Sequence, residues 1–401
     1  MRYWKDQLLK EQEQGWSSVD PDHMVCAKCF EDDAIQAFIR DTATERKCSY
    51  CGRRSKKPIA APMNDVLELI AGGLHYEYAD PIEENARDDG EWVIEPRDTS
   101  DVLAGIDPIT ENVDVFDEIV SAFSSSAWVD KPLWAPSGAD FLRYGWDDFV
   151  KAVKYDRRYL FLRPKRNRFS SSGITPDKML DQIGAVITEV GLVRTMDAGT
   201  RWFRARVHEP TKTYISAADL GTVPRKAARS SNRMSPAGIP MFYGAGDTAT
   251  AIAETYMPKP DKPAAVTVAQ FRTAREAWVV DLTALPTVPS LFDEERRHLR
   301  DPISFLRDFV EDFAKPIKKD GREHIEYVPT QVVTEYLRHV FRAENGHRVR
   351  GLIYQSARNG GCKCCVLFVR NKGCCRPTPG WENDKKKWLG LTGKPTRHDY
   401  R

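Results

Sequence analysis

The residues best suited to chemistry lie between positions 202 and 254 of the 401-residue chain. They are several arginines, one tyrosine and one carboxylate, namely Arg204, Arg206, Arg233, Tyr243 and Glu254. This set suits a dinucleotide. Guanidinium groups bind a pyrophosphate through paired, charge-assisted hydrogen bonds, and an aromatic side chain packs against a planar ring. A carboxylate stabilises positive charge that develops at a sugar carbon.

A strand, a long loop, a second strand and a helix must position these residues. Residues 201–207 alternate between an apolar side and a side that carries two arginines, which is typical of a half-buried strand. An edge strand with solvated arginines explains the same alternation. After a basic loop of about thirty residues, the sequence predicts a short strand at 242–243 and a helix capped by Asp247. Glu254 lies two turns into that helix, where a glutamate taken alone is more often a solvated residue than a catalyst.

Three later motifs extend the pattern: a helix, a strand that ends near a serine, and a closing strand, at residues 327–337, 351–358 and 366–369. In this order the motifs resemble the RES domain, a family named for a characteristic arginine, glutamate and serine, over roughly residues 195–375. The resemblance assigns the family positions to Arg204, Arg233, Tyr243, Glu254 and Ser356. Arg206 shares a strand face with Arg204, so either can be the first family arginine.

The resemblance implies NAD⁺ as the substrate and a fold related to that of ADP-ribosyltransferases, because RES domains are toxins that deplete NAD⁺. In this interpretation Glu254 stabilises charge at the anomeric carbon and the arginines clamp the pyrophosphate. Tyr243 stacks on or hydrogen-bonds to the nicotinamide end, and Ser356 hydrogen-bonds to the nicotinamide amide or a ribose hydroxyl. We therefore predict an NAD⁺ glycohydrolase or phosphorylase that releases nicotinamide, in a bacterial toxin or anti-phage defence protein.

Two other functions are compatible with these residues. One is an ADP-ribosyltransferase that modifies a macromolecule, and the other is a zinc-dependent nucleic-acid-binding protein with an inert RES-like domain. An NAD⁺-cleaving toxin must be restrained in its host, so we expect an antitoxin or a trigger protein that binds the N-terminal half. The acceptor stays open between water, phosphate and a macromolecule, and assembly into an oligomer is compatible with the sequence.

The nine cysteines form two clusters. The first consists of two Cys-x-x-Cys pairs that can supply four thiolates to a tetrahedral zinc ion: Cys26, Cys29, Cys48 and Cys51. Four protein ligands leave no open position, so we predict a structural zinc, with reduced free cysteines as the alternative. The second cluster allows either a second metal or ordinary thiols beside the last strand: Cys362, Cys364, Cys365, Cys374 and Cys375.

Composition shifts predict four segments. These are a zinc-knuckle segment, a mostly helical domain, a RES catalytic domain and a flexible lysine-rich tail, at residues 1–60, 61–165, 174–376 and 377–401. A basic, polar linker is predicted at 163–173. The helical segment resembles the N-terminal domain that precedes HEPN and RES effector domains, which implies a sensing or partner-binding module. A helical cap that only stabilises its neighbour is the alternative.

Composition and the remaining patterns bound the class of protein. Strands predicted at 265–272 and 278–282 and helices opened by Pro302 and Pro329 indicate an α+β fold, with the mixed α/β RES domain in the C-terminal half. The formal net charge of +2 gives no bulk argument for nucleic acid. The chain starts without an apolar signal-peptide core and has no apolar run long enough for a membrane span, so we expect a cytosolic protein.

Overall fold

The computed structural model describes residues 14–84, 87–88, 91–92, 94–106, 108–123, 126–131, 137–159, 173–257, 263–315 and 321–400. The chain forms two compact units. Unit 1 consists of Met1–Gly138 and Val288–Asp301, and unit 2 consists of Ala139–Thr287 and Pro302–Arg401. Of the linker predicted at 163–173, only Gly173 lies among the described residues.

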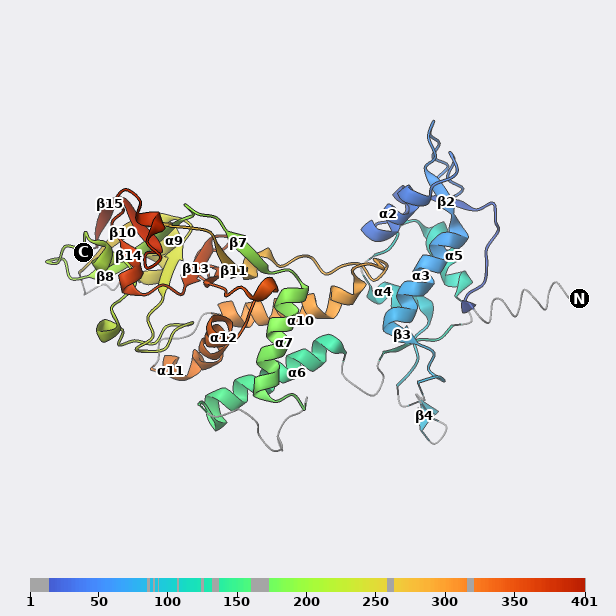
Figure 1. The fold of residues 1–401 in the computed structure, drawn as a ribbon. Helices are drawn as coiled ribbons and strands as arrows, with labels where there is room; N and C mark the ends of the chain where they lie inside the picture. The colour runs from blue at the N-terminus through green and yellow to red at the C-terminus, as the bar shows by residue number, and fades with distance from the viewer. Residues whose placement is uncertain are drawn as a thin grey trace, which may run out of the picture. The chain divides into compact units, whose positions relative to one another are not determined.

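The described part of unit 1 is mostly helical, with three short antiparallel strand pairs (Figure 1). Its helices are α2 (Asp33–Thr42), α3 (Met63–Glu77), α4 (Thr99–Gly105) and α5 (Val113–Ala122). The pairs are β1 (Met24–Cys26) with β2 (Ala60–Pro62), β3 (Tyr78–Ala79) with β6 (Val129–Asp130), and β4 (Arg87–Asp88) with β5 (Glu91–Trp92). The apolar patch predicted after Asn64 forms the buried face of α3, because Val66, Leu67 and Ile70 lie in the core of the unit.

A segment from the C-terminal half of the chain completes the core of unit 1. Leu291 and Phe292 are each 1% exposed and pack with the residues of α3. The Phe292 ring lies so close to Gly73 that a Cβ there would come within 2.5 Å of it. In the same segment Arg297 donates a hydrogen bond of 2.9 Å to the carbonyl oxygen of Gly72. This segment, Val288–Asp301, is therefore part of the folded N-terminal unit.

Replacing Phe292 with alanine is expected to destabilise unit 1 by about 3–5 kcal/mol, because the substitution leaves a cavity in a close-packed core. Thermal and urea unfolding of the full chain would measure the loss. Phe141→Ala is the matched control, since the Phe141 side chain is 41% exposed and lies in unit 2. Equal effects of the two substitutions would show that the segment is not a core element.

Unit 2 is built on a mixed sheet of nine strands in the order β14-β15-β10-β8-β9-β13-β12-β11-β7. The strands are β7 (Val193–Met196), β8 (Arg201–His208), β9 (Phe242–Ala245), β10 (Ala264–Thr273), β11 (Ala277–Asp281), β12 (Gly351–Gln355), β13 (Lys363–Leu367), β14 (Cys374–Cys375) and β15 (Leu389–Tyr400). Parallel pairing joins β11 to β12 and β14 to β15, and the other neighbours are antiparallel. The predicted α+β class is confirmed.

Helices of unit 2 share a core with the sheet. They are α6 (Gly138–Lys151), α7 (Pro176–Glu189), α10 (Arg300–Ala314) and α12 (Val328–His339). Ile183, Phe309 and Leu337 are buried in this core. Proline lies in the first turn of α7 and α12 as predicted, where the missing N–H is not needed and the fixed φ favours the helix.

The prediction of a flexible tail at 377–401 is wrong over residues 389–400. Residues 389–400 form β15, which pairs with β10 from Ala264 to Thr273. Leu389 and Leu391 alternate into the core beside Phe271. The lysines at 385–387 suggested a solvated tail. The alternation of apolar residues after them has the period of a half-buried strand, and this pattern determines the structure.

Candidate functional site

Helix α9 (Thr248–Thr255) holds Glu254 against the sheet. Asp247 begins the helix, because its carboxylate accepts hydrogen bonds from the backbone N–H of Thr250 at 2.8 Å and from the Thr250 hydroxyl at 2.6 Å. The helix packs on β8, β9 and β10 (Figure 1). Ala251 fixes its inner face, since it is buried with Ala205 of β8. Glu254, one turn later, is half-buried at the edge of this contact.

The Glu254 carboxylate is bound by the predicted serine. The Ser356 hydroxyl, just after β12, donates a hydrogen bond of 2.5 Å to Glu254 Oε1, across 102 positions of sequence. Two backbone N–H groups, of Arg358 and Asn359, donate in turn to Ser356 Oγ at 3.2 and 3.0 Å. Among the described residues, no group bonds to the other oxygen of Glu254, Oε2. The carboxylate is therefore held by one oxygen and open at the other.

Tyr243 on β9 lies at the centre of the predicted residues. Its backbone oxygen accepts a hydrogen bond of 2.6 Å from Arg204 Nη1, and its hydroxyl lies 2.9 Å from Ser235 Oγ. Burial raises the pKa of Tyr243 to about 12, so the phenol stays protonated at neutral pH. Because Tyr354 is also buried beside Tyr243 and Glu254, its pKa is raised well above the usual value. The protonated phenol of Tyr354 thus lies near the carboxylate, with the phenol of Tyr243 beside Tyr354.

Arg204 is a buried cation and Arg206 a half-buried one, and neither forms an ion pair in the described part of the chain. Arg204 is 9% exposed, and burial, followed by repulsion from Arg206, lowers its pKa to about 9. Arg206 donates a hydrogen bond of 2.6 Å to the carbonyl oxygen of Gly221, and its pKa is also lowered by burial. The Nε atoms of both arginines are buried and unbonded. An unpaired buried charge is costly, so this pair is suited to bind an anion.

The two arginines lie on one side of β8, and the helix that carries Glu254 packs on the other side. Arg204 and Arg206 lie on the same side of β8 as Trp202, which belongs to a hydrophobic cluster without residues of α9. Ala205 lies on the other side and packs against α9. β8 and β9, both fully described, pair only at Phe203 and Ala245. The strands diverge beyond that pair, and there the Arg204 guanidinium reaches the carbonyl group of Tyr243.

The loop that carries Arg233 is fastened to α12. Arg233 Nη1 donates to the carbonyl oxygen of Phe313 at 2.7 Å, and its guanidinium lies 5.9 Å from the ring centre of Tyr327. The Thr330 hydroxyl donates a short hydrogen bond to the carbonyl oxygen of Arg233. Gln331 donates in the same way to Asn232 at 2.8 Å. These contacts fix Arg233 and its part of the long loop beside Tyr327 and α12.

Sequence reasoning missed Tyr354, Ser235 and Asn359 at this site. Tyr354 could have been found, because it precedes Ser356 by two positions on the same strand face. Ser235 and Asn359 lie in loops, where the spacing of residues does not predict which way a side chain points. Their contacts with Tyr243 and with Thr250 depend on the tertiary fold.

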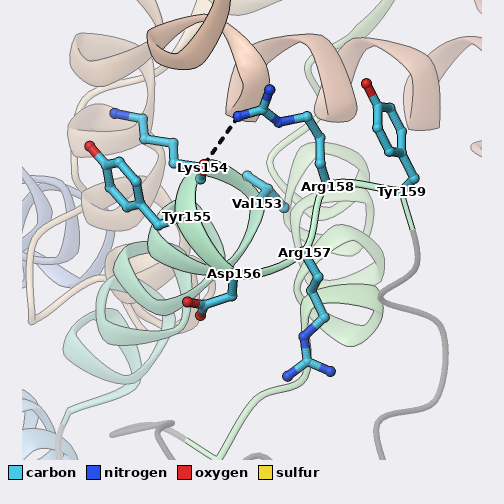
Figure 2. Close-up of a pocket in the computed structure, with 7 residues that line it drawn as sticks. All are labelled: Val153, Lys154, Tyr155, Asp156, Arg157, Arg158 and Tyr159. Atoms are coloured by element: carbon cyan, nitrogen blue, oxygen red, sulfur yellow. Dashed lines mark hydrogen bonds between the residues drawn. The ribbon is translucent and has the colours of Figure 1, made fainter.

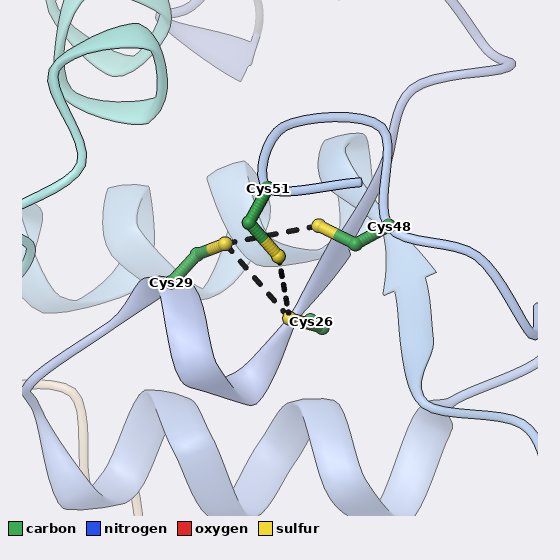
Figure 3. A group of neighbouring side chains, drawn as sticks. All are labelled: Cys26, Cys29, Cys48 and Cys51. Carbon is green, nitrogen blue, oxygen red and sulfur yellow. Dashed lines mark hydrogen bonds between the residues drawn. The ribbon is translucent and has the colours of Figure 1, made fainter. Parts of the chain in front are cut away.

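The first cysteine cluster has the geometry of a metal site. The sulfur atoms of Cys26, Cys29, Cys48 and Cys51 lie within 4.8 Å of one another (Figure 3). Three of the Sγ–Sγ distances are 3.6, 3.7 and 3.8 Å. A tetrahedral zinc ion with bonds of about 2.3 Å separates its sulfurs by about 3.8 Å, so the four thiols fit zinc.

The second cysteine cluster does not form a comparable group. Within the described ranges, the four thiols of the first cluster are the only set of three or more His, Cys, Asp or Glu side chains close enough to hold a metal. Cys364 and Cys365 are neighbours on β13 and therefore point to opposite sides of the sheet. Burial raises the pKa of Cys364 to about 12, so that thiol is protonated. The cysteines of this cluster are free thiols in the structure.

A separate hollow of about 220 Å³ lies at the end of α6. Its lining is a single stretch of chain, Val153–Tyr159, as Figure 2 shows. The Arg158 side chain bonds to the carbonyl oxygen of Lys154 across it. Ligand sites are usually enclosed by several elements with converging polar groups. This hollow is therefore a feature of a turn and not the site of the predicted chemistry.

Comparison with protein families agrees with this architecture. The chain matches the HEPN/RES N-terminal domain 1 over residues 41–167 and the RES domain over residues 201–382. No curated protein and no solved structure matches it significantly. The chain therefore carries a RES domain preceded by a HEPN/RES N-terminal domain. The RES family is consistent with an NAD-utilising enzyme. In the part of the chain that the structure describes, no helix is long and apolar enough to cross a membrane.

Proposed function

We propose that the protein cleaves NAD⁺ at the bond between nicotinamide and ribose. The observation that supports this most is the hydrogen bond from Ser356 to Glu254, which joins two of the family's three characteristic residues at 2.5 Å and leaves one carboxylate oxygen free. Beside this carboxylate lies Tyr354, with Tyr243 next to Tyr354, and both phenols are protonated. Such a set can stabilise a cationic sugar carbon beside a neutral leaving group.

The reaction proceeds by loss of nicotinamide. The C–N bond breaks and its electron pair stays on the ring nitrogen, so nicotinamide leaves neutral and positive charge develops at the anomeric carbon. Glu254 stabilises that charge, since a fixed carboxylate in a partly buried site acts more strongly than one in water. The acceptor oxygen, from water or phosphate, then bonds to the carbon, and Glu254 orients the acceptor. An attacking water loses a proton, which passes to solvent.

The arginines bind the rest of the substrate. Arg204 and Arg206 form no ion pair with a described carboxylate, and Asp219 acts on Arg206 only from a distance. This favours the pyrophosphate as their partner. Arg233 lies beside Tyr327, in the loop fastened to α12, and supplies a third cation. Because the Arg204 guanidinium binds the carbonyl group of Tyr243, binding at the arginines also fixes β9 at this tyrosine.

Replacing Arg204 with methionine is expected to abolish stabilisation by NAD⁺. In a Glu254→Gln background that slows turnover, NAD⁺ at one hundred times its Kd should stabilise the protein by about 2.7 kcal/mol. Thermal unfolding with and without NAD⁺ measures the difference. Arg201→Met is the matched control, because Arg201 is an exposed arginine of the same strand. An unchanged NAD⁺ effect in Arg204→Met would remove that residue from the binding site.

Expression in bacteria tests the proposed activity. Cellular NAD⁺ should fall when the wild type is induced and stay constant with Glu254→Ala at equal protein level. Radiolabel from the adenine part of NAD⁺ should end in a small molecule. Label that stays on protein or nucleic acid would instead identify an ADP-ribosyltransferase.

The restraint that such a toxin needs would come from an antitoxin or trigger that binds unit 1. A co-expressed partner that restores the cellular NAD⁺ level would identify this protein.

A further inference from the structure

The turn that follows β12 binds helix α9 at three points. Ser356 bonds to the carboxylate of Glu254, and Arg358 Nη1 donates to the carbonyl oxygen of Ala253 at 3.1 Å. Asn359 Nδ2 donates to the hydroxyl oxygen of Thr250 at 2.7 Å. Two of these contacts fix the helix backbone and its first turn, and the third fixes the side chain of the proposed catalytic residue.

The turn is itself closed by local hydrogen bonds. The backbone N–H of Cys362 donates to Asn359 at 3.2 Å, and that of Ser356 donates to the carbonyl oxygen of Cys362 at 2.9 Å. Gly361 has φ of 87°, which the third residue of a type II turn requires and which glycine adopts without strain. The Asn-Gly-Gly-Cys sequence at 359–362 thus makes a preformed loop that presents Ser356 and Asn359 to the helix.

The hydroxyl group of Ser356 has no capacity left for substrate. It gives its one proton to Glu254 and accepts from the N–H groups of Arg358 and Asn359, which uses both lone pairs. The Asn359–Thr250 bond extends the same chain, because the Thr250 hydroxyl donates on to Asp247, the cap of α9. One continuous network therefore runs from the helix cap through the turn to the carboxylate.

We propose that Ser356, Arg358 and Asn359 are positioning residues that hold Glu254 Oε1, so that Oε2 points to the reacting carbon, and that Ser356 acts through Glu254 and not on the nicotinamide amide. The expected effect of these residues on the reaction rate rests on the proposed function. The three bonds from the turn to α9, called the clamp below, can be measured without turnover.

The test combines turnover with hydrogen exchange in the full-length protein. Asn359→Ala is expected to lower kcat for nicotinamide release by roughly tenfold with KM for NAD⁺ nearly unchanged, because orientation and not binding is lost. Amides of α9 should exchange roughly tenfold faster, as expected for a lost hydrogen bond to a helix. Thr250→Val removes the other partner together with the bond to Asp247, so Asn359→Ala with Thr250→Val should equal Thr250→Val alone. Asn383→Ala, at an exposed asparagine in unit 2, is the control.

The outcomes separate the two proposals. Absence of nicotinamide release by the wild type would count against NAD⁺ cleavage, while faster exchange in Asn359→Ala would still support the clamp. Unchanged exchange of α9 would overturn the clamp whatever the activity. Faster exchange with unchanged kcat in an active enzyme, or additive effects in the double variant, would overturn the positioning role.

Discussion

Replacing Glu254 with glutamine is expected to lower the rate of nicotinamide release from NAD⁺ by about 10²–10³-fold, the usual cost of removing a group that stabilises transition-state charge. Glutamine has nearly the same shape and its amide oxygen can still accept the bond from Ser356. The substitution therefore removes the negative charge and keeps the packing of α9. Steady-state kinetics should show the loss in kcat, with KM for NAD⁺ little changed.

Glu209→Gln controls for the loss of one carboxylate in the same unit, because the Glu209 side chain lies exposed after β8 and, among the described residues, pairs with Lys212 alone. Its kinetics should match the wild type. A loss of less than tenfold in Glu254→Gln would mean that charge at this position is not central to the reaction. An equal loss in both variants would point to a general effect of net charge.

Removal of zinc is expected to unfold the zinc knuckle and much of unit 1. Structural zinc in Cys₄ sites contributes on the order of 10–16 kcal/mol of apparent binding energy, which folding of such small modules requires. Here Cys26, Cys29 and Cys48 are buried in the same core as α3. Cys48→Ser should lower the zinc content of the purified protein to near zero and increase hydrogen exchange over residues 24–63.

The knuckle is tied to α5, so its loss should extend there. Glu118 of α5 accepts from His23 Nδ1 at 2.7 Å and forms a short hydrogen bond with the Tyr50 hydroxyl. Cys375→Ser is the control, because Cys375 lies on β14 in unit 2 and is outside the group of four thiols. Full zinc content and normal exchange in Cys48→Ser would show that the four thiols hold no metal that matters for folding.

Strong periodicity made most of the fold predictable. The strand at 201–207, the apolar face of α3 and the proline-initiated α7 and α12 all follow from local alternation or helical spacing. Contacts between segments far apart in the sequence could not be predicted. Nothing in the segment around Leu291 and Phe292 indicates that it packs into unit 1, because its partners lie more than two hundred positions away. For this reason the full chain, and not an isolated C-terminal fragment, is the suitable protein for activity assays.

The site was predictable in its parts and not in its arrangement. Residue type and order pointed to Arg204, Tyr243, Glu254 and Ser356. Their mutual bonds, from Arg204 to the Tyr243 carbonyl group and from Ser356 to Glu254, depend on how β8, β9 and β12 lie in the sheet. The alternation along β8 also separates Arg204 from the side on which α9 packs, a consequence that appears only once the helix is placed.

Nicotinamide release by the purified full-length protein tests the central claim most directly. NAD⁺ labelled in its nicotinamide ring is incubated with stoichiometric protein, with and without phosphate, beside Glu254→Ala and Arg233→Ala. The account predicts free nicotinamide from the wild type alone, and a rate that rises with phosphate would identify phosphate as the acceptor. Intact NAD⁺ after prolonged incubation with stoichiometric wild-type protein, or equal release by Glu254→Ala, would contradict it.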